Sequence, residues 1–377
     1  MICFGHDWSG DPLSKTHLMR LLARDNRVLW INSIGYRTPT VSGRDLRRAI
    51  KKLKAFTEPV REVEKNIHVL NPLAIPAYGL PAIRSINRQI LRYQILSAIK
   101  RLGFQRPINW VFNPSGSIVA GELREDKIVY YCVDEFTSFS DAGTRSMAEM
   151  EASLLRRADL VVVSSERLLK SKSAYNPKTV LVRHGVDFDH FRRALLPETE
   201  VPAEIAHLPR PIIGYFGLMA ADWIDRDLLV KIAERFPQGS LVLLGNVTMD
   251  LAPLARLPNV HLPGRKPFKM LPAYCKGFDA AILPFPISEV TLNANPLKVR
   301  EYLAAGLPVV STKIPEVEVL NQVTIGDTHD AFLRGLDEVL REPGPRADRS
   351  ESMRRESWEE RVEELRGQYA RLVEGET

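Results

Sequence analysis

The feature that most constrains the fold of this chain is a regular alternation of short apolar runs with helical segments. The first half contains the runs ICFG, RVLWIN, NIHVL, NWVF, KIVYYCV, LVVVS and TVLVR. The second half contains IIGYFG, SLVLLGN, NVHLPG, AAILPF, PVVST and VTIG. Runs that are apolar throughout and separated by helices indicate parallel strands covered on both faces. The sequence therefore predicts an α/β protein with two doubly wound, Rossmann-like domains.

A polar, Pro-rich stretch separates the two series. Residues 192–211 read RRALLPETEVPAEIAHLPRP and contain little that could form a core, which is typical of an interdomain linker. We therefore expect an N-terminal domain over residues 1–195, a C-terminal domain over 205–345 and a last helix over 350–377. Two such domains would face each other across a cleft, where ligands bind at the carboxyl ends of the strands.

Charge is unevenly distributed over the 377 residues, whose formal net charge is +6. Two basic amphipathic segments, 43–56 and 81–104, lie in the first half. Such helices bind anionic membrane surfaces, although a solvated helix face packed on a domain has the same pattern. We expect no nucleic acid partner, because a mild basic excess does not by itself indicate one. Peripheral contact with the inner membrane face is the favoured interpretation.

Other sequence signals bear on the compartment. No stretch approaches the roughly 20 apolar residues of a membrane-spanning helix, and the first residues lack the features of a signal peptide. Cys3, Cys132 and Cys275 are far apart and form no CxxC pair, so neither a zinc site nor a disulfide framework is indicated. A reducing cytoplasm is the expected location.

Several catalytic motifs do not occur in the sequence. GxGxxG after a strand, GxxxxGK[ST] and HExxH are all missing, which argues against a nicotinamide dehydrogenase, a P-loop NTPase and a zinc protease. No DxD stands at a strand end, so a metal-clamped diphosphate is not indicated either. We expect no metal and no tightly bound cofactor.

The segment 293–312, NANPLKVREYLAAGLPVVST, carries the strongest signal for binding. Asn295 is a suitable N-cap and Pro296 suits the first helical position. Lys298 then lies in the first turn, where the helix dipole and free N–H groups favour phosphate. Glu301 lies one turn further on the same face, where a carboxylate can accept hydrogen bonds from a ribose diol. The pattern fits a nucleotide diphosphate, but a plain Lys298–Glu301 surface pair remains an alternative.

The same segment resembles the nucleotide-binding helix of GT-B glycosyltransferases of the GT4-like group (glycosyl transferases group 1). Its P-x-K-x-x-E-Y-x-A-x-G-x-P-V-V pattern is matched by PLKVREYLAAGLPVV. The similarity extends over about residues 160–377, whereas the first 150 residues resemble the family only in architecture. It implies the GT-B fold, with the terminal helix ESWEERVEEL crossing back toward the N-terminal domain.

The resemblance also implies a set of donor-binding residues. They are Gly217, Leu218, Met219, Arg265, Lys266, Pro284, Asn295, Pro296, Leu297, Lys298 and Glu301. In this set Glu301 would hold the ribose, Lys298 the phosphates and the loop 217–219 the pyrophosphate and nucleoside. Arg265 and Lys266 would lie near the base and Pro284 beside the sugar. His184 would face the donor and is a candidate catalytic residue.

Position 293 departs from the family pattern, because many GT4 enzymes carry a glutamate there and this chain has Asn293. The chemistry can instead come from KIVYYCVDEFTSF, which is similar to a stretch of inverting glucuronosyltransferases of xanthan-type pathways. Asp134 follows this strand and is the first candidate for a general base, with Glu135 as the second. A turn cap is the alternative role for Asp134.

The loop after the first strand, GHDWSGDPLSKTH, is a candidate for the acceptor side. His6, Asp7 and Trp8 leave the strand, and Lys15 begins the next helix. An exposed tryptophan would suit a sugar face, although an ordinary strand–helix connection has the same composition.

Together these features predict a glycosyltransferase that moves a sugar from a nucleotide diphosphate donor, with UDP favoured, to a hydroxyl acceptor. The acceptor would be a glycolipid, a polysaccharide precursor or a related molecule. A nucleotide-sugar 2-epimerase of the same architecture and a non-catalytic nucleotide- or partner-binding homologue remain alternatives. The sugar, the base, the acceptor, the stereochemical outcome and the oligomeric state stay open.

Overall fold

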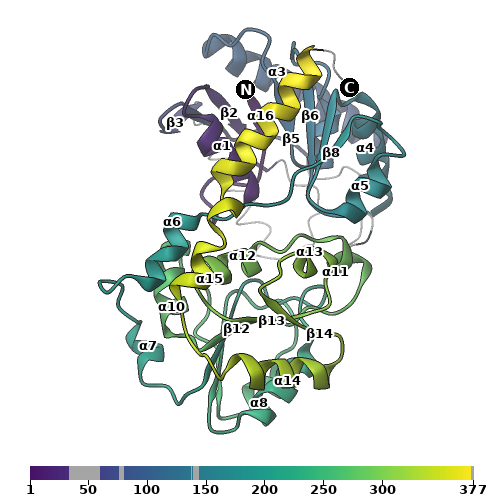
Figure 1. Ribbon diagram of the computed structural model, residues 1–377. Helices are drawn as coiled ribbons and strands as arrows, with labels where there is room; N and C mark the ends of the chain where they lie inside the picture. The colour runs from purple at the N-terminus through teal and green to yellow at the C-terminus, as the bar shows by residue number, and fades with distance from the viewer. Residues whose placement is uncertain (34–59, 76–79, 137, 139–143, 375–377) are drawn as a thin grey trace. The chain divides into compact units, whose positions relative to one another are not determined.

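The computed structural model describes residues 1–33, 60–75, 80–136, 138 and 144–374 (Figure 1). Contacts divide the chain into two compact units: unit 1, with residues 1–182 and 362–377, and unit 2, with residues 183–361. The basic segment 43–56 lies outside the described residues.

Unit 1 is built on an eight-stranded sheet in the order β3-β4-β2-β1-β5-β6-β7-β8. Its strands are β1 (Ile2–Phe4), β2 (Val28–Ile31), β3 (Arg61–Glu64), β4 (Ile67–Leu70), β5 (Asn109–Val111), β6 (Ile128–Cys132), β7 (Leu160–Val163) and β8 (Thr179–Leu181). All neighbours are parallel except β3, which pairs antiparallel with β4. The sequence did not predict β3, because three of its four residues, REVE, are charged and all are partly or fully exposed, so they give no apolar run.

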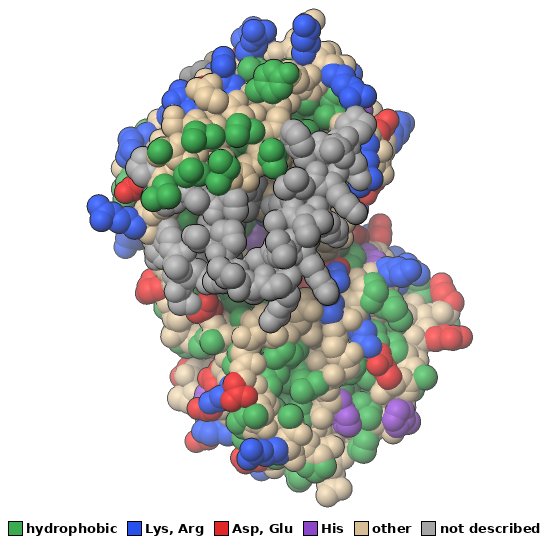
Figure 2. Space-filling model, turned by 180° about the vertical axis from the view of Figure 1, so that it is seen from behind, with side chains coloured by type: hydrophobic (Ala, Val, Ile, Leu, Met, Phe, Trp, Pro, Cys, Tyr) green, Lys and Arg blue, Asp and Glu red, His purple; other side chains and the backbone are tan. Residues whose placement is uncertain are grey.

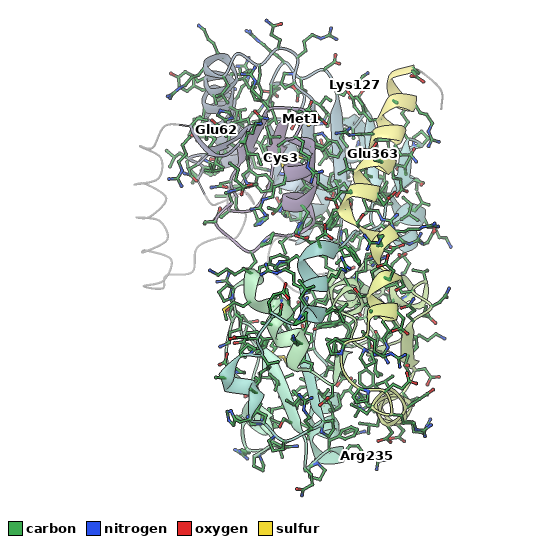
Figure 3. All side chains as sticks on the ribbon, turned by 60° about the vertical axis from the view of Figure 1, so that its left-hand side comes forward. Met1, Cys3, Glu62, Lys127, Arg235 and Glu363 are labelled. Carbon is green, nitrogen blue, oxygen red and sulfur yellow. The ribbon has the colours of Figure 1, made fainter. Side chains whose placement is uncertain are left out.

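Helices and short 3-10 segments complete unit 1. They are α1 (Ser14–Leu22), α3 (Pro81–Arg101), η1 (Pro114–Ile118), α4 (Thr144–Arg157), α5 (Glu166–Lys172) and the part of α16 (Trp358–Glu374) that follows residue 361. The strands β1, β2, β6 and β7 are buried along their whole length, as the continuous apolar runs predict. Figure 3 marks Met1 and Lys127, which precede β1 and β6, at the same end of this sheet.

Unit 2 contains a six-stranded, fully parallel sheet in the order β11-β10-β9-β12-β13-β14. Its strands are β9 (Ile212–Phe216), β10 (Ser240–Leu244), β11 (Val260–His261), β12 (Ala280–Leu283), β13 (Val309–Thr312) and β14 (Val323–Gly326). Counted from β9, this is the order 3-2-1-4-5-6 of dinucleotide-binding folds. The order reverses between β9 and β12, so the loops after these two strands flank the position where such sheets bind ligands.

Many short helices surround this sheet. They are α6 (Phe188–Phe191), η2 (Arg192–Leu195), α7 (Ala203–Ala206), α8 (Arg226–Arg235), α9 (Ala252–Ala255), η3 (Phe268–Met270), α10 (Leu271–Gly277), α11 (Glu289–Asn293), α12 (Leu297–Ala304), α13 (Pro315–Glu318), α14 (His329–Val339), α15 (Ala347–Glu351) and η4 (Arg354–Glu356). Helices α8 and α14 pack side by side, as Figure 1 shows.

The structure corrects our interpretation of residues 192–211. This stretch lies within unit 2, and Ala194 and Ile205 belong to the buried core. The segments η2 and α7 both pack against α10, so isolated apolar residues in a polar stretch are buried by a neighbouring element. Among the residues described, no helix has the length and apolar character needed to cross a bilayer.

Candidate active site

Helix α12 begins at Leu297 and ends at Ala304, and its C-terminus is closed by Gly306. Gly306 has a φ of +82°, its N–H donates to the Leu303 carbonyl, and the Leu307 N–H donates to the Tyr302 carbonyl. These two bonds form a Schellman cap, which explains why glycine stands between the helix and strand β13. The sequence pattern thus correctly predicted the end of the helix.

The predicted start of α12 was wrong by one position, because Pro296 and not Asn295 is the N-cap. The buried Asn295 amide oxygen instead accepts a hydrogen bond from Arg300 Nη1 at 2.6 Å. The Asn295 carbonyl lies 2.8 Å from His184 Nδ1. Asn295 therefore joins the segment after β8 to the first turns of α12.

Lys298 lies against the glycine that follows β9. A β-carbon added at Gly217 would overlap the Lys298 Cε and lie 3.0 Å from its Nζ. Gly217 also has a φ of +147°, a conformation that side chains rarely adopt. The structure thus brings together the Lys298 ammonium and the loop after β9, two parts of the predicted donor site that are 81 positions apart in the chain.

Glu301 lies on the same helix as Lys298, and both side chains are partly exposed. Burial raises the pKa of Glu301 to about 7, against the opposing effect of the Lys298 ammonium. Neither side chain forms a hydrogen bond or an ion pair with another residue in the described part of the chain. A plain Lys298–Glu301 surface pair is therefore not what the structure contains. The two groups are available to a ligand.

His184 is buried and packs beside the Trp358 ring, with 5.8 Å between the ring centroids. Because the Asn295 carbonyl can only accept, Nδ1 carries the proton and donates, which leaves a lone pair on Nε2. Burial and the neighbouring Arg300 lower the pKa of His184 to about 3. This does not support general acid–base catalysis at neutral pH, and His184 is better suited to accept a hydrogen bond.

Arg300 was missed by sequence reasoning, although it stands between Lys298 and Glu301. Its side chain is fully buried, and its Nε lies 3.3 Å from a Glu356 carboxylate oxygen. Arg361 binds the same carboxylate oxygen at 2.8 Å. Arg300 therefore anchors α12 to the segment before α16, and nothing in its local sequence distinguishes it from a surface arginine.

Several other predicted donor residues do not face outward. Met219 and Pro284 are buried, and Met219 belongs to the core of unit 2. The Met219 backbone pairs with Asn246 and Thr248 after β10, and the Pro284 carbonyl accepts from Asp225. Their side chains therefore cannot bind a ligand as predicted, because neighbouring loops bury them. Leu218, at 44% exposure, is the accessible side chain of the loop 217–219.

Arg265 and Lys266, which were predicted to lie near the nucleobase, differ in their surroundings. Arg265 is exposed, whereas the Lys266 ammonium is 2.7 Å from a Glu204 carboxylate oxygen and lies over the Tyr274 ring. An ammonium held by a carboxylate does not support the expected role of Lys266 beside a base. Leu297 and the buried Pro296 open α12 as described above, and their backbone positions agree with the predicted phosphate end of the helix.

In unit 1, Asp134 follows β6 and Lys15 lies in the first turn of α1. Burial raises the pKa of Asp134 to about 6, and the positive charge of Lys15 limits this rise. Burial also lowers the pKa of Lys15. The Asp134 carboxylate makes no hydrogen bond or ion pair to any residue that the structure describes. A free carboxylate with a pKa near 6 has the properties of a general base.

Glu135 is not available in the same way. Both of its carboxylate oxygens accept from the Lys172 ammonium, at 2.9 and 2.8 Å, and the same ammonium is 3.0 Å from Glu151. All three side chains are largely buried. The second candidate base is therefore an ion-pair partner, because α4 and α5 bring Glu151 and Lys172 against the strand end. No local pattern of residues indicated this cluster.

The loop after β1 is organised by Trp30, which the sequence indicated only as a strand residue. A β-carbon at Gly5 would overlap the Trp30 ring, and Trp30 Nε1 donates to the His6 carbonyl at 2.8 Å. The Trp8 ring packs edge-on against Trp30 at 4.8 Å, with the Arg20 guanidinium over it. Trp8 is thus partly buried, contrary to the expected exposed stacking surface.

The other residues of this loop differ in exposure. Asp7 is exposed, and His6 is partly buried with its Nε2 3.3 Å from the Asp11 carbonyl. Burial, together with the charge of Lys15, lowers the pKa of His6 to about 4. His6, Lys15 and Asp134 are therefore near one another at the carboxyl ends of β1 and β6. In the described ranges, no three or more His, Cys, Asp or Glu residues are grouped so as to hold a metal ion.

Unit 2 and the chain as a whole are similar to known proteins. Residues 210–342 match the family model described as glycosyl transferases group 1. This region is therefore similar to the group 1 glycosyltransferases. A Bacillus subtilis protein named as a teichuronic acid biosynthesis glycosyltransferase, TuaH, is 24% identical to the chain over 257 residues. The match covers 62% of this chain and 64% of TuaH, so the chain spans less than two thirds of that relative's length.

Solved structures are similar to this chain over nearly its whole length. Sucrose-phosphate synthase from Thermosynechococcus elongatus superposes with a TM-score of 0.71 at 16% identity, covering 99% of both chains. Anabaena HepE, solved in complex with UDP-glucose, gives a TM-score of 0.65 at 12% identity over 98% of both chains. At these identities the likeness concerns the fold, which is that of GT-B glycosyltransferases, as the sequence predicted. The similarity to xanthan-type enzymes stays a prediction.

Proposed function

We propose that this protein transfers a sugar from a nucleotide diphosphate donor, a UDP-sugar, to a hydroxyl group of a glycolipid or a polysaccharide precursor. The observation that carries the proposal is the pair Lys298 and Glu301, one turn apart on α12 and partly exposed, with no hydrogen bond or ion pair to any described residue. The match of residues 210–342 to group 1 glycosyltransferases and the UDP-glucose bound by HepE support the same donor class.

In unit 2, the Lys298 ammonium and the first N–H groups of α12 would bind the diphosphate, and Glu301 would bind the ribose diol. These positive groups stabilise the charge that develops on the departing diphosphate, so no metal ion is needed for that role. With its pKa near 7, Glu301 would be partly ionised at neutral pH, and ionisation favours hydrogen bonds from the two ribose hydroxyls.

In unit 1, Asp134 would act as the general base. The acceptor oxygen would form a bond to the anomeric carbon while the bond from that carbon to the diphosphate oxygen breaks. The acceptor proton would pass to the Asp134 carboxylate. Lys15 would keep the pKa of Asp134 below neutrality, so that the carboxylate is ionised when the acceptor binds.

Peripheral contact with a membrane surface is also proposed, because two basic segments, 43–56 and 81–104, lie in the N-terminal part of the chain. Co-sedimentation with vesicles of anionic phospholipid should fall when Arg47, Arg48, Lys51 and Lys52 are all replaced by Glu. Unchanged sedimentation would refute the membrane contact without affecting the transferase proposal.

The transferase proposal is tested by incubating the protein with a panel of nucleotide sugars and a membrane lipid extract. Release of the nucleoside diphosphate that requires the extract would support transfer to a lipid-linked acceptor. The decisive variant is Lys298→Ala, which should weaken UDP binding in calorimetry by at least about tenfold. Lys313→Ala, an exposed lysine of unit 2, is the matched control and should bind UDP normally. Equal affinity of Lys298→Ala and this control would exclude the donor site.

A further inference from the structure

A hollow of about 820 Å³ lies in unit 1, beside the C-terminal half of α3. The segments that lead into β5 and β6 form its other wall, so it lies at the amino ends of the parallel strands. Asp134, Lys15 and His6 lie at the opposite, carboxyl ends of the same sheet. The hollow therefore has no part in the site described above.

Charge in the lining is of one sign. Four of its residues are cationic and none is acidic; the cations are Arg92, Lys100, Arg106 and Arg124. Arg106 pairs with Asp126, and Arg92 lies 3.9 Å from Glu122. Lys100 and Arg124 form no ion pair with any residue that the structure describes. Two uncompensated positive charges therefore line one concave surface, which favours an anionic ligand.

The backbone of two of these arginines is unusual. Arg106 has a φ of +45° and Arg124 a φ of +59°, in the left-handed region that non-glycine residues seldom occupy. Within the described ranges, one other residue besides glycine, Asn66, has a positive φ. Such conformations cost energy and cluster at functional sites. Both arginines line the hollow, one on the approach to each strand.

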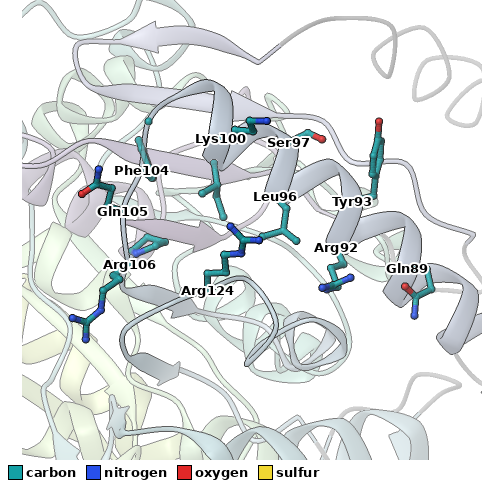
Figure 4. Close-up of a pocket in the computed structure, with 13 residues that line it drawn as sticks. Gln89, Arg92, Tyr93, Leu96, Ser97, Lys100, Phe104, Gln105, Arg106 and Arg124 are labelled. Carbon is teal, nitrogen blue, oxygen red and sulfur yellow. The ribbon is translucent and has the colours of Figure 1, made fainter.

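Neutral groups of the lining favour a sugar. Tyr93, Ser97 and Lys100 follow one another at helical spacing along α3, and Figure 4 shows them projecting from the same flank of the helix. Tyr93 is 75% exposed, so most of its large aromatic surface is accessible. Aromatic rings pack on the apolar faces of sugar rings, hydroxyl and amide groups such as Ser97 and Gln89 bind sugar hydroxyls, and the ammonium binds an acidic substituent.

Figure 4 shows Arg92 and Leu96 on the other flank of α3, with Arg124 extending toward Leu96. In the space-filling view, Lys and Arg side chains gather around the end of unit 1 that is drawn uppermost (Figure 2). A flat membrane surface would engage protruding groups, whereas here cations, an aromatic ring and hydrogen-bonding groups share a concave surface. The concavity and the mixed lining favour a saccharide over a lipid surface.

We propose that this hollow binds a short segment of an acidic saccharide, one whose sugar rings carry carboxylate groups. A ring would pack on Tyr93, and the carboxylates would bind Lys100 and Arg124. The proposal does not depend on the transferase function, because binding at the amino ends of the strands requires neither a donor nor turnover.

The test is calorimetric titration of the full chain, without nucleotide sugar, with trigalacturonate and with the neutral trisaccharide maltotriose. We expect trigalacturonate to bind and maltotriose to bind at least about tenfold more weakly. The double variant Lys100→Ala/Arg124→Ala should weaken trigalacturonate binding by about tenfold or more. Tyr93→Ala, at an exposed position, should weaken it by about fivefold.

The matched control is Lys65→Ala/Arg101→Ala, which removes two exposed cations of unit 1 outside the hollow and should leave the affinity unchanged. Equal loss in the control would mean non-specific attraction and would overturn the proposal. So would unchanged binding in Lys100→Ala/Arg124→Ala, or equal affinity for maltotriose. If that variant instead loses only its binding to vesicles of anionic phospholipid, the hollow is a membrane contact and the saccharide proposal is wrong. Nucleoside diphosphate release by the same variants reports separately on the transferase proposal.

Discussion

The Lys298 Cε lies over the backbone of Gly217, in the space that any other residue at position 217 would fill with its β-carbon, and the ammonium lies next to that space. This relationship joins the first turn of α12 to the loop after β9, at the point where the strand order of unit 2 reverses. A lysine near a helix start is by itself weak evidence for an anion site, and so is a glycine after a strand. Here the two lie together and form one candidate anion site.

Gly217→Ala should therefore remove UDP binding through displacement of Lys298. We expect an affinity loss of at least about tenfold in calorimetry, comparable to that of Lys298→Ala. Gly344→Ala is the control, because Gly344 also has a positive φ but its Cβ position has only the Phe278 carbonyl oxygen nearby, at 4.0 Å. If both glycine variants bind UDP equally well, Lys298 does not need its position over Gly217.

The pKa of Glu301 predicts a pH dependence of stability. The folded-state pKa of about 7 lies above the ordinary value of 4.5, so the folded protein binds this proton more tightly than the unfolded chain. The stabilisation from this group is complete below pH 4.5 and is lost as the pH rises through 7. Thermal melting between pH 4.5 and 8 should show this loss in the wild-type protein and a smaller one in Glu301→Gln. Parallel melting curves would contradict a raised pKa at Glu301.

Asp134→Asn should abolish sugar transfer while UDP affinity stays normal, because the base acts on the acceptor and the donor is bound by unit 2. In the wild-type enzyme, kcat/KM should fall below about pH 6, where Asp134 becomes protonated. Near-normal turnover of Asp134→Asn would show that another group is the base.

Lys15 should determine the pH below which kcat/KM falls, which is the acidic limb of the pH profile. Removing its charge in Lys15→Met should raise the pKa of Asp134, because the ammonium now lowers it, and the limb should move to higher pH. Lys15→Arg keeps the charge and should keep the limb close to pH 6. A pH profile of kcat/KM that is identical in both variants would mean that Lys15 does not act on Asp134.

Lys172→Met should destabilise unit 1 by about 3 kcal/mol, because it leaves the buried carboxylates of Glu135 and Glu151 without their cation. Lys170→Met, an exposed position on the same helix, should change the free energy of unfolding by less than about 0.5 kcal/mol. Chemical denaturation measures both. A small effect at Lys172 would mean that the two carboxyl groups are protonated or solvated.

The sequence by itself determined most strands of the two sheets and the course of α12 up to its glycine cap. Apolar runs are long enough to define strands, and Pro296, Lys298 and Gly306 act within a single helix, so their meaning is local. The strand β3 was not predicted because an edge strand can carry mostly polar residues and therefore shows no apolar run. The start of α12 was misplaced because Asn295 had a better partner in Arg300 than in the helix backbone.

The tertiary structure alone decided which side chains are available. It buried Met219 and Pro284, paired Glu135 with Lys172 and placed Trp8 against Trp30. It left Asp134, Lys298 and Glu301 without a hydrogen bond or ion pair to the residues described. Each of these outcomes depends on contacts between residues far apart in the chain. Burial and pairing are properties of the packed neighbourhood, which no local pattern of residues contains.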